Sequence, residues 1–357
     1  MTVAAERISV QEALHLWQGP PLELARRADE VRRRRFPENH VTFIKDRVIN
    51  YTNVCITDCG FCAFYRPPKH PEGYLLTRDE VFRRIDELVR IGGTQVLMQG
   101  GHHPNLKIEF YEELFSAIKA RFPIYLHALS ASELDHIAKV SHLSLEEVVR
   151  RLKSAGWDSL PGGGAEILVD EVRERISPLK ISADRWFEIH ETLHGLGVES
   201  TATMVYGFGE RLEHRLQHLD RVRALQDRTG RFRAFIPWSF TPYRTALSDV
   251  PTAAGLEYLK VIALARLFLD NVRHIDCGWL TEGQRVCQMA LFSGADDIGG
   301  LVMDDRVISA TGVEYQIGVN RILSLIRHSG RIPALRNTEY QILKIYEAGE
   351  WEGATPA

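Results

Sequence analysis

The chain lacks several features that would assign it to a special class of protein. No apolar run is long enough to span a membrane, and the N-terminus has no long apolar region of the kind that a signal peptide carries. A net charge of −3 over 357 residues excludes a general electrostatic binder of nucleic acid. Cysteine is scarce, with five residues, which argues against an extracellular disulfide framework. We therefore expect a cytoplasmic enzyme with neither a nucleic-acid nor a membrane partner.

What is present is a repeated alternation of strand-like and helix-like segments. The β-branched or apolar runs predict strands at 48–55, 94–99, 124–128, 156–160, 199–206, 232–237, 272–276 and 296–299. The amphipathic stretches between them predict helices, for example at 78–91, 109–121, 144–155, 184–196, 211–227 and 252–270. Strands that alternate with helices form parallel sheets, and eight such units predict an α/β fold of the (β/α)8 TIM-barrel type.

The two ends of the chain are expected to flank this barrel as helices. Helices are predicted at 9–17 and 21–36, with a break at Pro20 and Pro21, and the second ends in four arginines, which we interpret as a solvated helix end. A closing helix at 312–327 and a final helix near 338–348 are predicted at the other end. The expected division is a packed N-terminal segment (1–40), the barrel (41–330) and a helical tail (331–357), all within one domain.

Three cysteines stand within eight residues and follow the first predicted strand. Cys55, Cys59 and Cys62 have the spacing C-x3-C-x2-C. Thiols so close together are typical of iron–sulfur or zinc ligands rather than of core residues. Three protein ligands leave one position open, as in a catalytic metal site. By contrast, Cys277 and Cys287 are expected to be buried small hydrophobic residues.

The spacing, with the aromatic Phe61 directly before Cys62, resembles the signature of the radical S-adenosylmethionine (SAM) enzymes. The resemblance implies a 4Fe-4S cluster on Cys55, Cys59 and Cys62, with SAM bound through its amino and carboxylate groups to the open iron. It also implies that Phe61 lies beside the adenine. The reduced cluster of that family cleaves SAM to methionine and a 5′-deoxyadenosyl radical.

Further polar and glycine-rich motifs follow other predicted strands, and in a barrel they gather at the same rim as the cysteine loop. Gly100 and Gly101 follow the second strand and match the Gly-Gly element of the radical SAM family, whose backbone approaches the methionine part of SAM. The run Leu160-Pro-Gly-Gly-Gly-Ala-Glu166 follows the fourth strand. It lacks the Lys-Ser/Thr of a phosphate-binding loop, so we reject that function. A carboxylate at this rim suits hydrogen bonding, and we expect Glu166 to bind a ribose or an ammonium group.

Several motifs together resemble one branch of that family, the radical enzymes of the futalosine pathway to menaquinone and their relatives. They are Asn50-Tyr-Thr-Asn-Val-Cys55, Cys59-Gly-Phe-Cys-Ala-Phe-Tyr65, Gln99-Gly-Gly-His-His-Pro104, the glycine-rich run before Glu166, and Ala234-Phe-Ile-Pro-Trp238. Within the branch, Gln99 and Trp238 favour the cyclic dehypoxanthine futalosine synthases over the aminofutalosine synthases and the deazaflavin FO synthase subunits. One departure is Arg244, where that family has Asn.

The resemblance implies a cyclisation of dehypoxanthine futalosine. The 5′-deoxyadenosyl radical takes a hydrogen atom from the ribose C4′, and the carbon radical adds to the benzoate ring. Loss of one electron and one proton then restores the aromatic ring. The partners implied are this small-molecule substrate and an electron donor such as flavodoxin or ferredoxin. Candidate catalytic residues are His103 and Asp158; candidate substrate contacts are His102, His127 and Arg244, with Lys69 as a second possible cation for the benzoate.

Three other interpretations of the same residues stay open. A zinc site could use the three cysteines with His70, although zinc modules usually contain paired C-x2-C or H-x3-H motifs. A ferredoxin-like electron carrier would need a fourth cysteine nearby. His102 and His103 could belong to a metal-dependent hydrolase barrel, although those barrels usually take an H-x-H from the end of the first strand, where this chain has Cys55.

Overall fold

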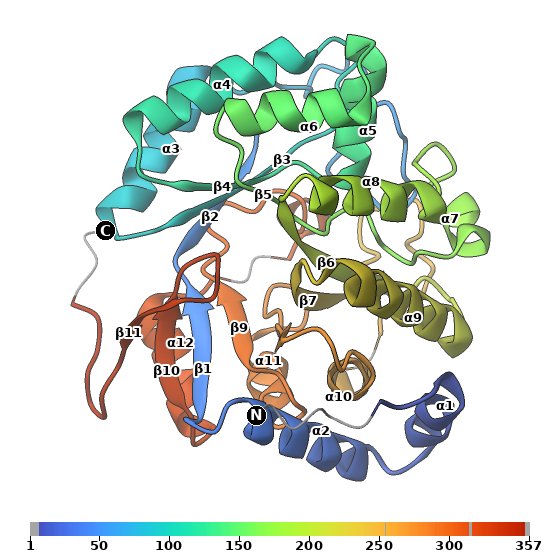
Figure 1. Cartoon of the computed structure of the whole chain (residues 1–357), viewed down its shortest axis with the longest axis vertical. Coiled ribbons are helices and arrows are strands. Elements are labelled where there is room, and N and C mark those ends of the chain that lie inside the picture. Colours follow the sequence, from blue (N-terminus) through green and yellow to red (C-terminus); the bar gives the residue numbers. More distant parts are fainter. Residues whose placement is uncertain (1–6, 254, 314–315, 354–357) are drawn as a thin grey trace.

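Seven parallel strands form the main sheet of the computed structural model, which describes residues 7–253, 255–313 and 316–353 (Figure 1). Their order in the sheet follows their order in the chain: β2 (Asp46–Asn50), β3 (Gln95–Gln99), β4 (Tyr125–Ala128), β5 (Ser159–Leu160), β6 (Glu199–Tyr206), β7 (Phe232–Ser239) and β8 (His274–Ile275). This sequential parallel order is what strand–helix–strand units produce, because each crossover returns the chain beside the previous strand.

The two edges of this curved sheet are joined through the chain around β9 (Asp297–Gly300). Asp276, directly after β8, bridges to Asp297, and Met303, shortly after β9, bridges to Arg47 of β2. The predicted TIM-type α/β fold is therefore confirmed. All eight predicted strands are present within a few residues of their expected positions.

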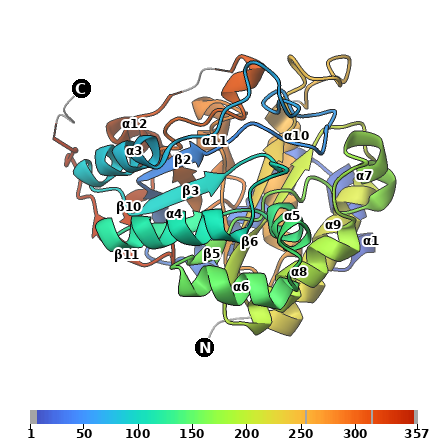
Figure 2. The same cartoon turned by 90° about the horizontal axis from the view of Figure 1, so that it is seen from above.

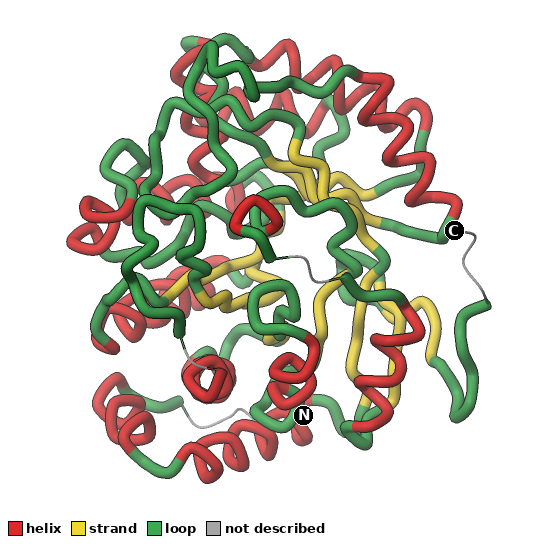
Figure 3. Tube along the Cα trace, turned by 180° about the vertical axis from the view of Figure 1, so that it is seen from behind, coloured by secondary structure: helices red, strands yellow, loops and turns green. Residues whose placement is uncertain are grey.

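Helices cover the outside of the sheet, as the top view and the view from behind show (Figures 2 and 3). The predicted helices correspond to α3 (Arg78–Arg90), α4 (Ile108–Arg121), α6 (Leu145–Ser154), α8 (Ala183–Gly195), α9 (Leu212–Thr229) and α10 (Gly255–Phe268). Three further helices were not predicted: α5 (Ala131–Ser141), α7 (Asp170–Ile176) and α11 (Gln284–Ala290). In the described part of the chain, none of these helices has the length and apolar character needed to cross a bilayer.

The N-terminal helices α1 (Val10–Gln18) and α2 (Pro21–Arg35) pack beside α10 (Figure 1). The arginine run at the end of α2 is only partly solvated, so our interpretation of it was wrong in part. Arg32 is fully buried and donates to Asp29 and Asn39. Arg35 donates to the carbonyls of Asp270 and Val272, both at 2.8 Å. Arg35 therefore ties the N-terminal segment to the barrel, whereas the hydrogen bonds of Arg32 stay within that segment.

A second sheet, in the order β11-β10-β1-β9, was not predicted. Besides β9, it contains β1 (His40–Ile44), β10 (Ile332–Arg336) and β11 (Ile342–Ile345). The last two strands follow a short 3-10 turn, Ser309–Thr311, and the helix α12 (Val319–His328). The closing helix is thus present but shorter than 312–327, part of which (314–315) lies outside the described residues, as do residues 1–6 and 354–357 of the expected end segments.

The predicted final helix near 338–348 is wrong, because this segment forms the hairpin of β10 and β11. Asn337 ends β10 with a side chain whose Oδ1 accepts hydrogen bonds from the N–H groups of Glu339 and Gln341, both at 3.0 Å. Tyr340 takes a left-handed backbone conformation in the same turn. An asparagine that bonds its own backbone in this way favours a turn over a helix. The paired strands then override the helical pattern of the sequence.

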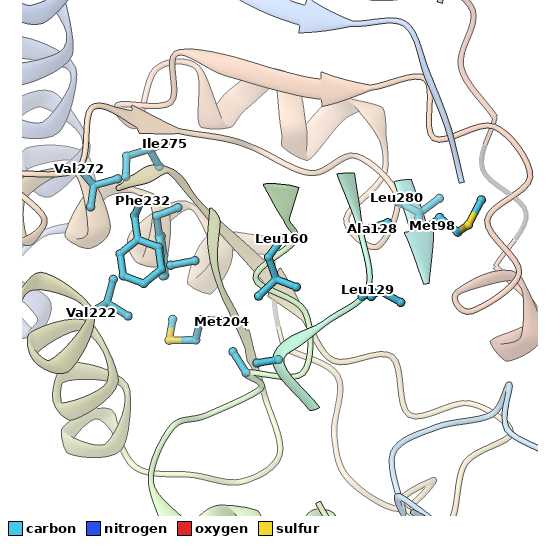
Figure 4. Packing of buried hydrophobic residues seen from close by; sticks show 14 of the residues in the cluster. Met98, Ala128, Leu129, Leu160, Met204, Val222, Phe232, Val272, Ile275 and Leu280 are labelled. Carbon is cyan, nitrogen blue, oxygen red and sulfur yellow. The ribbon is translucent and has the colours of Figure 1, made fainter. Parts of the chain in front are cut away.

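The side chains of the barrel strands alternate between two environments. One set points outward and packs against the helices; Figure 4 shows members of this core from β3 to β8, such as Met98, Leu160, Met204 and Phe232. The alternate positions line the barrel interior. Apolar residues are present there (Val48, Leu97, Val205, Ile236 and Trp238), but more positions are polar than in the branched aliphatic layers of an ordinary TIM barrel: Asp46, Asn50, Gln95, Gln99, His127, Thr201 and Thr203. A polar interior is typical of a barrel that holds a ligand.

Candidate active site

The interior side chains surround a cavity of about 370 Å³ that runs along the barrel axis. Away from the cysteine loop, its wall contains Asp276, which directly follows β8, Arg336 at the end of β10, and Tyr340, whose hydroxyl donates to Asp276 at 2.8 Å. Its upper wall contains Phe61 and Cys62 of the cysteine loop. The cavity therefore connects the cysteine loop with the polar interior.

The cysteine loop is held in place by its own backbone. The N–H groups of Cys55 and Cys62 donate to the carbonyls of Arg66 and Cys59 at 2.9 and 3.0 Å, and Gly60 donates to Ile176 at 2.9 Å. The Thr57 hydroxyl lies 3.0 Å from the sulfur of Cys55 and 3.5 Å from that of Cys59. Two of the three thiols thus face one side of the loop.

None of the three thiols forms a disulfide, and the thiols differ in their exposure to solvent. Cys55 and Cys59 are buried, whereas Cys62 is half-buried and lines both the interior cavity and an outer hollow, which Cys59 also lines. Burial raises the pKa of Cys59 to about 11, so this thiol must lose a proton when it becomes a metal ligand. A group bound by these sulfurs would be reached from the interior on one side and from the surface on the other.

The glycine pair packs directly against this loop. A Cβ on Gly101 would lie 2.3 Å from the Val54 carbonyl oxygen and 2.8 Å from the Cys55 Cβ, and a Cβ on Gly100 would lie 2.6 Å from the Tyr51 ring. The close approach allows the N–H of His102 to donate to the Cys55 sulfur at 3.3 Å. Only glycine leaves room for this contact, and the donor set of three thiols with a backbone N–H fits an iron–sulfur cluster.

The glycine pair also contacts a buried carboxylate that the sequence analysis did not identify. Glu133, on α5, accepts from the Gly100 N–H at 3.0 Å and from the Tyr51 hydroxyl at 2.9 Å. Burial raises the pKa of Glu133 to about 7, against the lowering effect of these hydrogen bonds. The carboxylate fixes the strand end that packs on Cys55.

Glu166 lines the cavity as predicted, and it is paired there with two cations that sequence reasoning missed. Lys180 lies 2.8 Å from one carboxylate oxygen and Arg173 lies 3.4 Å from the other. Burial alone would lower the pKa of Lys180, but the charges of Glu166 and Cys59 outweigh it and raise the pKa above its usual value. No motif marks Lys180, which reaches the site only through the loop after α7.

Lys180 also contacts the aromatic residue of the cysteine motif. Its ammonium lies 5.3 Å from the centroid of the Phe61 ring, within the range of a cation–π interaction. Phe61 packs on Phe208 at 5.7 Å between ring centroids. A buried cation, a carboxylate and an aromatic face thus stand together beside Cys62, which suits a ligand that carries both charges and a flat ring.

Of the three predicted histidines, His127 lines the cavity, whereas His102 and His103 do not. His127 lines the cavity, with Nδ1 2.7 Å from the Ser159 hydroxyl, and burial keeps its pKa well below the usual value. His102 is buried beside Cys55, with Nε2 3.2 Å from Ser132, and burial lowers its pKa to about 3. His103 lines neither the cavity nor the outer hollow.

Two candidate residues are not where we expected them. Asp158 precedes β5 at the amino end of the barrel and forms an ion pair with Lys119 at 2.6 Å, so its expected position at the catalytic rim is wrong. Arg244 lines the outer hollow with Cys59 and His70 rather than the interior cavity. In both cases the strand or loop was predicted correctly, but the end or face on which the side chain lies was not.

The zinc alternative finds no support in the arrangement of these side chains. His70 Nδ1 accepts a hydrogen bond from the Glu72 N–H at 3.1 Å. Within the described ranges, no group of three or more His, Cys, Asp and Glu side chains is arranged to hold a single metal ion.

Comparison with known families agrees with the cysteine loop and the barrel. The radical SAM superfamily matches residues 49–222, and the CofH/MqnC C-terminal region matches residues 229–349. The first match contains the three cysteines and Glu166, and the second extends through the β10–β11 hairpin. The FeFe-hydrogenase maturase HydG from Carboxydothermus hydrogenoformans shares the fold, with a TM-score of 0.76 at 16% identity over 94% of this chain and 78% of that chain.

The curated relatives are more specific. The cyclic dehypoxanthine futalosine synthases of Streptomyces coelicolor and Halalkalibacterium halodurans are 48% and 43% identical to this chain, covering 96% and 98% of it and 88% and 95% of their own lengths. The aminodeoxyfutalosine synthase of Thermus thermophilus is 36% identical and covers 97% of this chain and 95% of its own.

The fold and the cysteine site thus define a radical SAM enzyme, which uses a 4Fe-4S cluster and SAM. Within that superfamily, the chain belongs to the futalosine-pathway family that includes the cyclic dehypoxanthine futalosine synthases.

Proposed function

We propose that this enzyme converts dehypoxanthine futalosine to cyclic dehypoxanthine futalosine in menaquinone biosynthesis. The observation that carries this proposal is the 48% identity to a synthase of that name, compared with 36% to an aminodeoxyfutalosine synthase and 38% to a 5-amino-6-(D-ribitylamino)uracil–L-tyrosine 4-hydroxyphenyl transferase. The interior cavity supports it, since its many hydroxyl and amide side chains suit a ribose-containing substrate.

The cofactor residues follow from the geometry of the loop. Cys55, Cys59 and Cys62 would hold the cluster, and the His102 N–H would stabilise the negative charge on the Cys55 sulfur. When bound, the cluster and SAM supply a 5′-deoxyadenosyl radical, which removes a hydrogen atom from the substrate ribose. Electrons for this chemistry would come from a flavodoxin or a ferredoxin.

Residues packed around the cysteine loop would bind SAM. Phe61 would lie against the adenine, and Gly100 and Gly101 would bring backbone close to the methionine part. Lys180 offers a cation to its carboxylate, and Glu166 offers acceptors to its ammonium group or ribose. Lys180 and Glu166 are paired with each other, so binding of SAM would exchange one buried ion pair for others.

The substrate would then occupy the cavity below, and the protein's part in the cyclisation is to hold it and exclude water. Gln99, His127 and Thr203 line the interior and can hydrogen-bond the sugar. Trp238 and Phe240 are aromatic residues of the lining, suited to contact with the benzoate ring. The ring closure needs this ring near the ribose, and an enclosed cavity favours that folded conformation.

The test is an anaerobic assay of the reconstituted enzyme with SAM, dithionite and each candidate substrate in turn. We expect 5′-deoxyadenosine and a cyclised product with dehypoxanthine futalosine only. Product formation with the aminodeoxyfutalosine synthase or hydroxyphenyl transferase substrates, and none with dehypoxanthine futalosine, would assign the enzyme to another activity of the same family.

A further inference from the structure

Only one carboxylate of the cavity, Glu166, has a part in the scheme above. Four carboxylates line this cavity: Asp46, Glu166, Asp276 and Asp305. Glu166 is paired with Lys180 and Arg173, and Asp276 accepts from Tyr340 and lies 3.7 Å from Arg336. Asp46 accepts from the Val302 N–H at 2.9 Å and from the Gln95 amide at 3.4 Å.

Asp305 differs from these three because its partners are backbone groups only. The Ile308 N–H donates to its Oδ1 at 2.7 Å, and among the residues that the structure describes no side chain donates to it and no cation pairs with it. It is half-buried and lines the cavity. The carboxylate is therefore oriented by the chain but not neutralised.

The position of Asp305 along the barrel axis is fixed by the segment after β9. This segment runs beside β2, where the Val48 N–H donates to the Met303 carbonyl at 2.9 Å and the Arg306 N–H donates to the Asn50 side chain at 3.0 Å. Asp305 lies between these contacts and so at the carboxyl end of β2, directly before the cysteine loop begins. Its neighbour Asp304 points the other way and pairs with Arg47, with Nε 2.6 Å away.

His127 also lines the cavity and has a ring nitrogen that could accept a proton, but it lies deeper. The strand register places Val48, Leu97, His127 and Ser159 in one layer, and Asn50 and Gln99 in the next layer toward the rim. Asp305 belongs with the upper layer, on the side of Phe61 and Cys62. The hydrogen atom is removed there, because the cofactor residues are there.

We propose that Asp305 is the proton acceptor of the final step of the cyclisation, an assignment that rests on the proposed function. In this step the ring carbon that has formed the new bond to C4′ breaks its C–H bond. The proton goes to the Asp305 carboxylate, and one electron goes to a one-electron carrier of the iron–sulfur or flavin class, which restores the aromatic ring. The carboxylic acid then returns the proton to solvent.

The surroundings of Asp305 suit this task. Burial raises its pKa to about 6, against the lowering effect of the Ile308 and Val307 N–H groups, and no neighbouring charge contributes. The ionisable groups on other elements that line the same cavity are Asp46, Cys62, His127, Glu166, Asp276, Cys277, Arg336 and Tyr340. Of these, Asp46 also has a pKa that burial raises to about 6, but it lies at the start of β2, away from Phe61 and Cys62. A base with a pKa near the working pH is ionised and still accepts a proton readily.

The test measures cyclised product and 5′-deoxyadenosine separately, with dehypoxanthine futalosine as the substrate. For Asp305→Asn we expect 5′-deoxyadenosine to form within about threefold of the wild-type rate, while cyclised product per 5′-deoxyadenosine falls about 100-fold. Asp305→Glu should recover most of the coupling. Asp304→Asn is the matched control, since it makes the same change one residue away on the outer side, and it should leave the ratio unchanged.

The pH profile gives a second readout, which a merely structural role would not move. In the wild type the product ratio should fall as pH drops below about 6, because protonated Asp305 cannot accept a proton. In Asp305→Asn this dependence should vanish. Should Asp305→Asn fail to fold, Asp46→Asn decides the matter, because it removes the other cavity carboxylate whose pKa burial raises to about 6. A pH dependence retained in Asp46→Asn supports Asp305, whereas its loss there, or a wild-type ratio independent of pH between 5 and 8, would overturn the assignment.

The two proposals fail in different ways. If the wild type cleaves SAM but forms no cyclised product from this substrate, the proposed function is wrong and the role of Asp305 falls with it. If the wild type cyclises and Asp305→Asn keeps the wild-type ratio, only the role of Asp305 is wrong.

Discussion

The functional residues are distributed differently in two arcs of the barrel, one from β2 to β6 and the other from β7 onward. The arc from β2 to β6 carries the cofactor residues in short runs, such as the cysteine motif and the glycine pair, in which neighbours in sequence act together. The arc from β7 onward holds none of the predicted cofactor residues, and it lines the cavity from several separate segments that contribute, for example, Trp238, Cys277, Asp305 and Tyr340. A cofactor of constant shape can be recognised by a motif, whereas a substrate wall is assembled from separate strand ends.

The largest effect that would test this contrast is the loss of a cluster ligand. Cys62→Ala should abolish iron binding and reduce 5′-deoxyadenosine formation to background, because the cluster would keep two protein ligands. The control is Cys287→Ala on the other arc, a buried thiol 3.3 Å from the sulfur of Cys277 and outside the cavity lining. It should retain iron and SAM cleavage. Full iron content in Cys62→Ala would contradict our assignment of the site.

A smaller effect is expected at Lys180, which belongs to the cofactor arc without belonging to a motif. Lys180→Met should raise the KM for SAM about 10- to 100-fold, because it removes a charge-assisted hydrogen bond worth about 1.5–3 kcal/mol. The Kd for dehypoxanthine futalosine should change little. Lys119→Met removes a lysine from an ion pair at the amino end of the barrel and should leave both constants unchanged. An unchanged KM for SAM in Lys180→Met would place SAM elsewhere.

The smallest effect is expected where the glycine pair meets the cysteine loop. Gly101→Ala should lower the free energy of unfolding of the metal-free protein by about 1–3 kcal/mol, the usual cost of overpacking, and should reduce iron uptake. Gly195→Ala, in α8 with open space around its Cα, should instead be neutral or stabilising by up to about 1 kcal/mol. Denaturant unfolding and iron analysis measure both. Equal free energies of unfolding for the two variants would show that the cysteine loop accommodates the added methyl group without loss of stability.

Local sequence patterns were enough to predict the alternating strands and helices of the barrel and the cysteine loop. The eight barrel strands were predicted because their buried runs are bounded by turn residues, and the buried state of Cys277 and Cys287 is confirmed. The hairpin of β10 and β11 was missed, because its helical pattern loses to backbone pairing with β1 that no local window contains. The misplacement of Asp158 has a similar origin, since a strand pattern does not say at which end a flanking side chain will find its partner.

The sequence by itself therefore determined the order of the eight barrel strands and of the main helices between them, the three thiols and the family, because these depend on residues close together in the chain. Only the tertiary structure decided that Lys180 meets Glu166 beside Phe61, that Arg244 lies outside the cavity and that Asp305 lines it. These contacts join segments far apart in the chain, and the curvature of the sheet brings them together. The cavity itself belongs to this second group, since it exists only when the polar faces of all the strands converge.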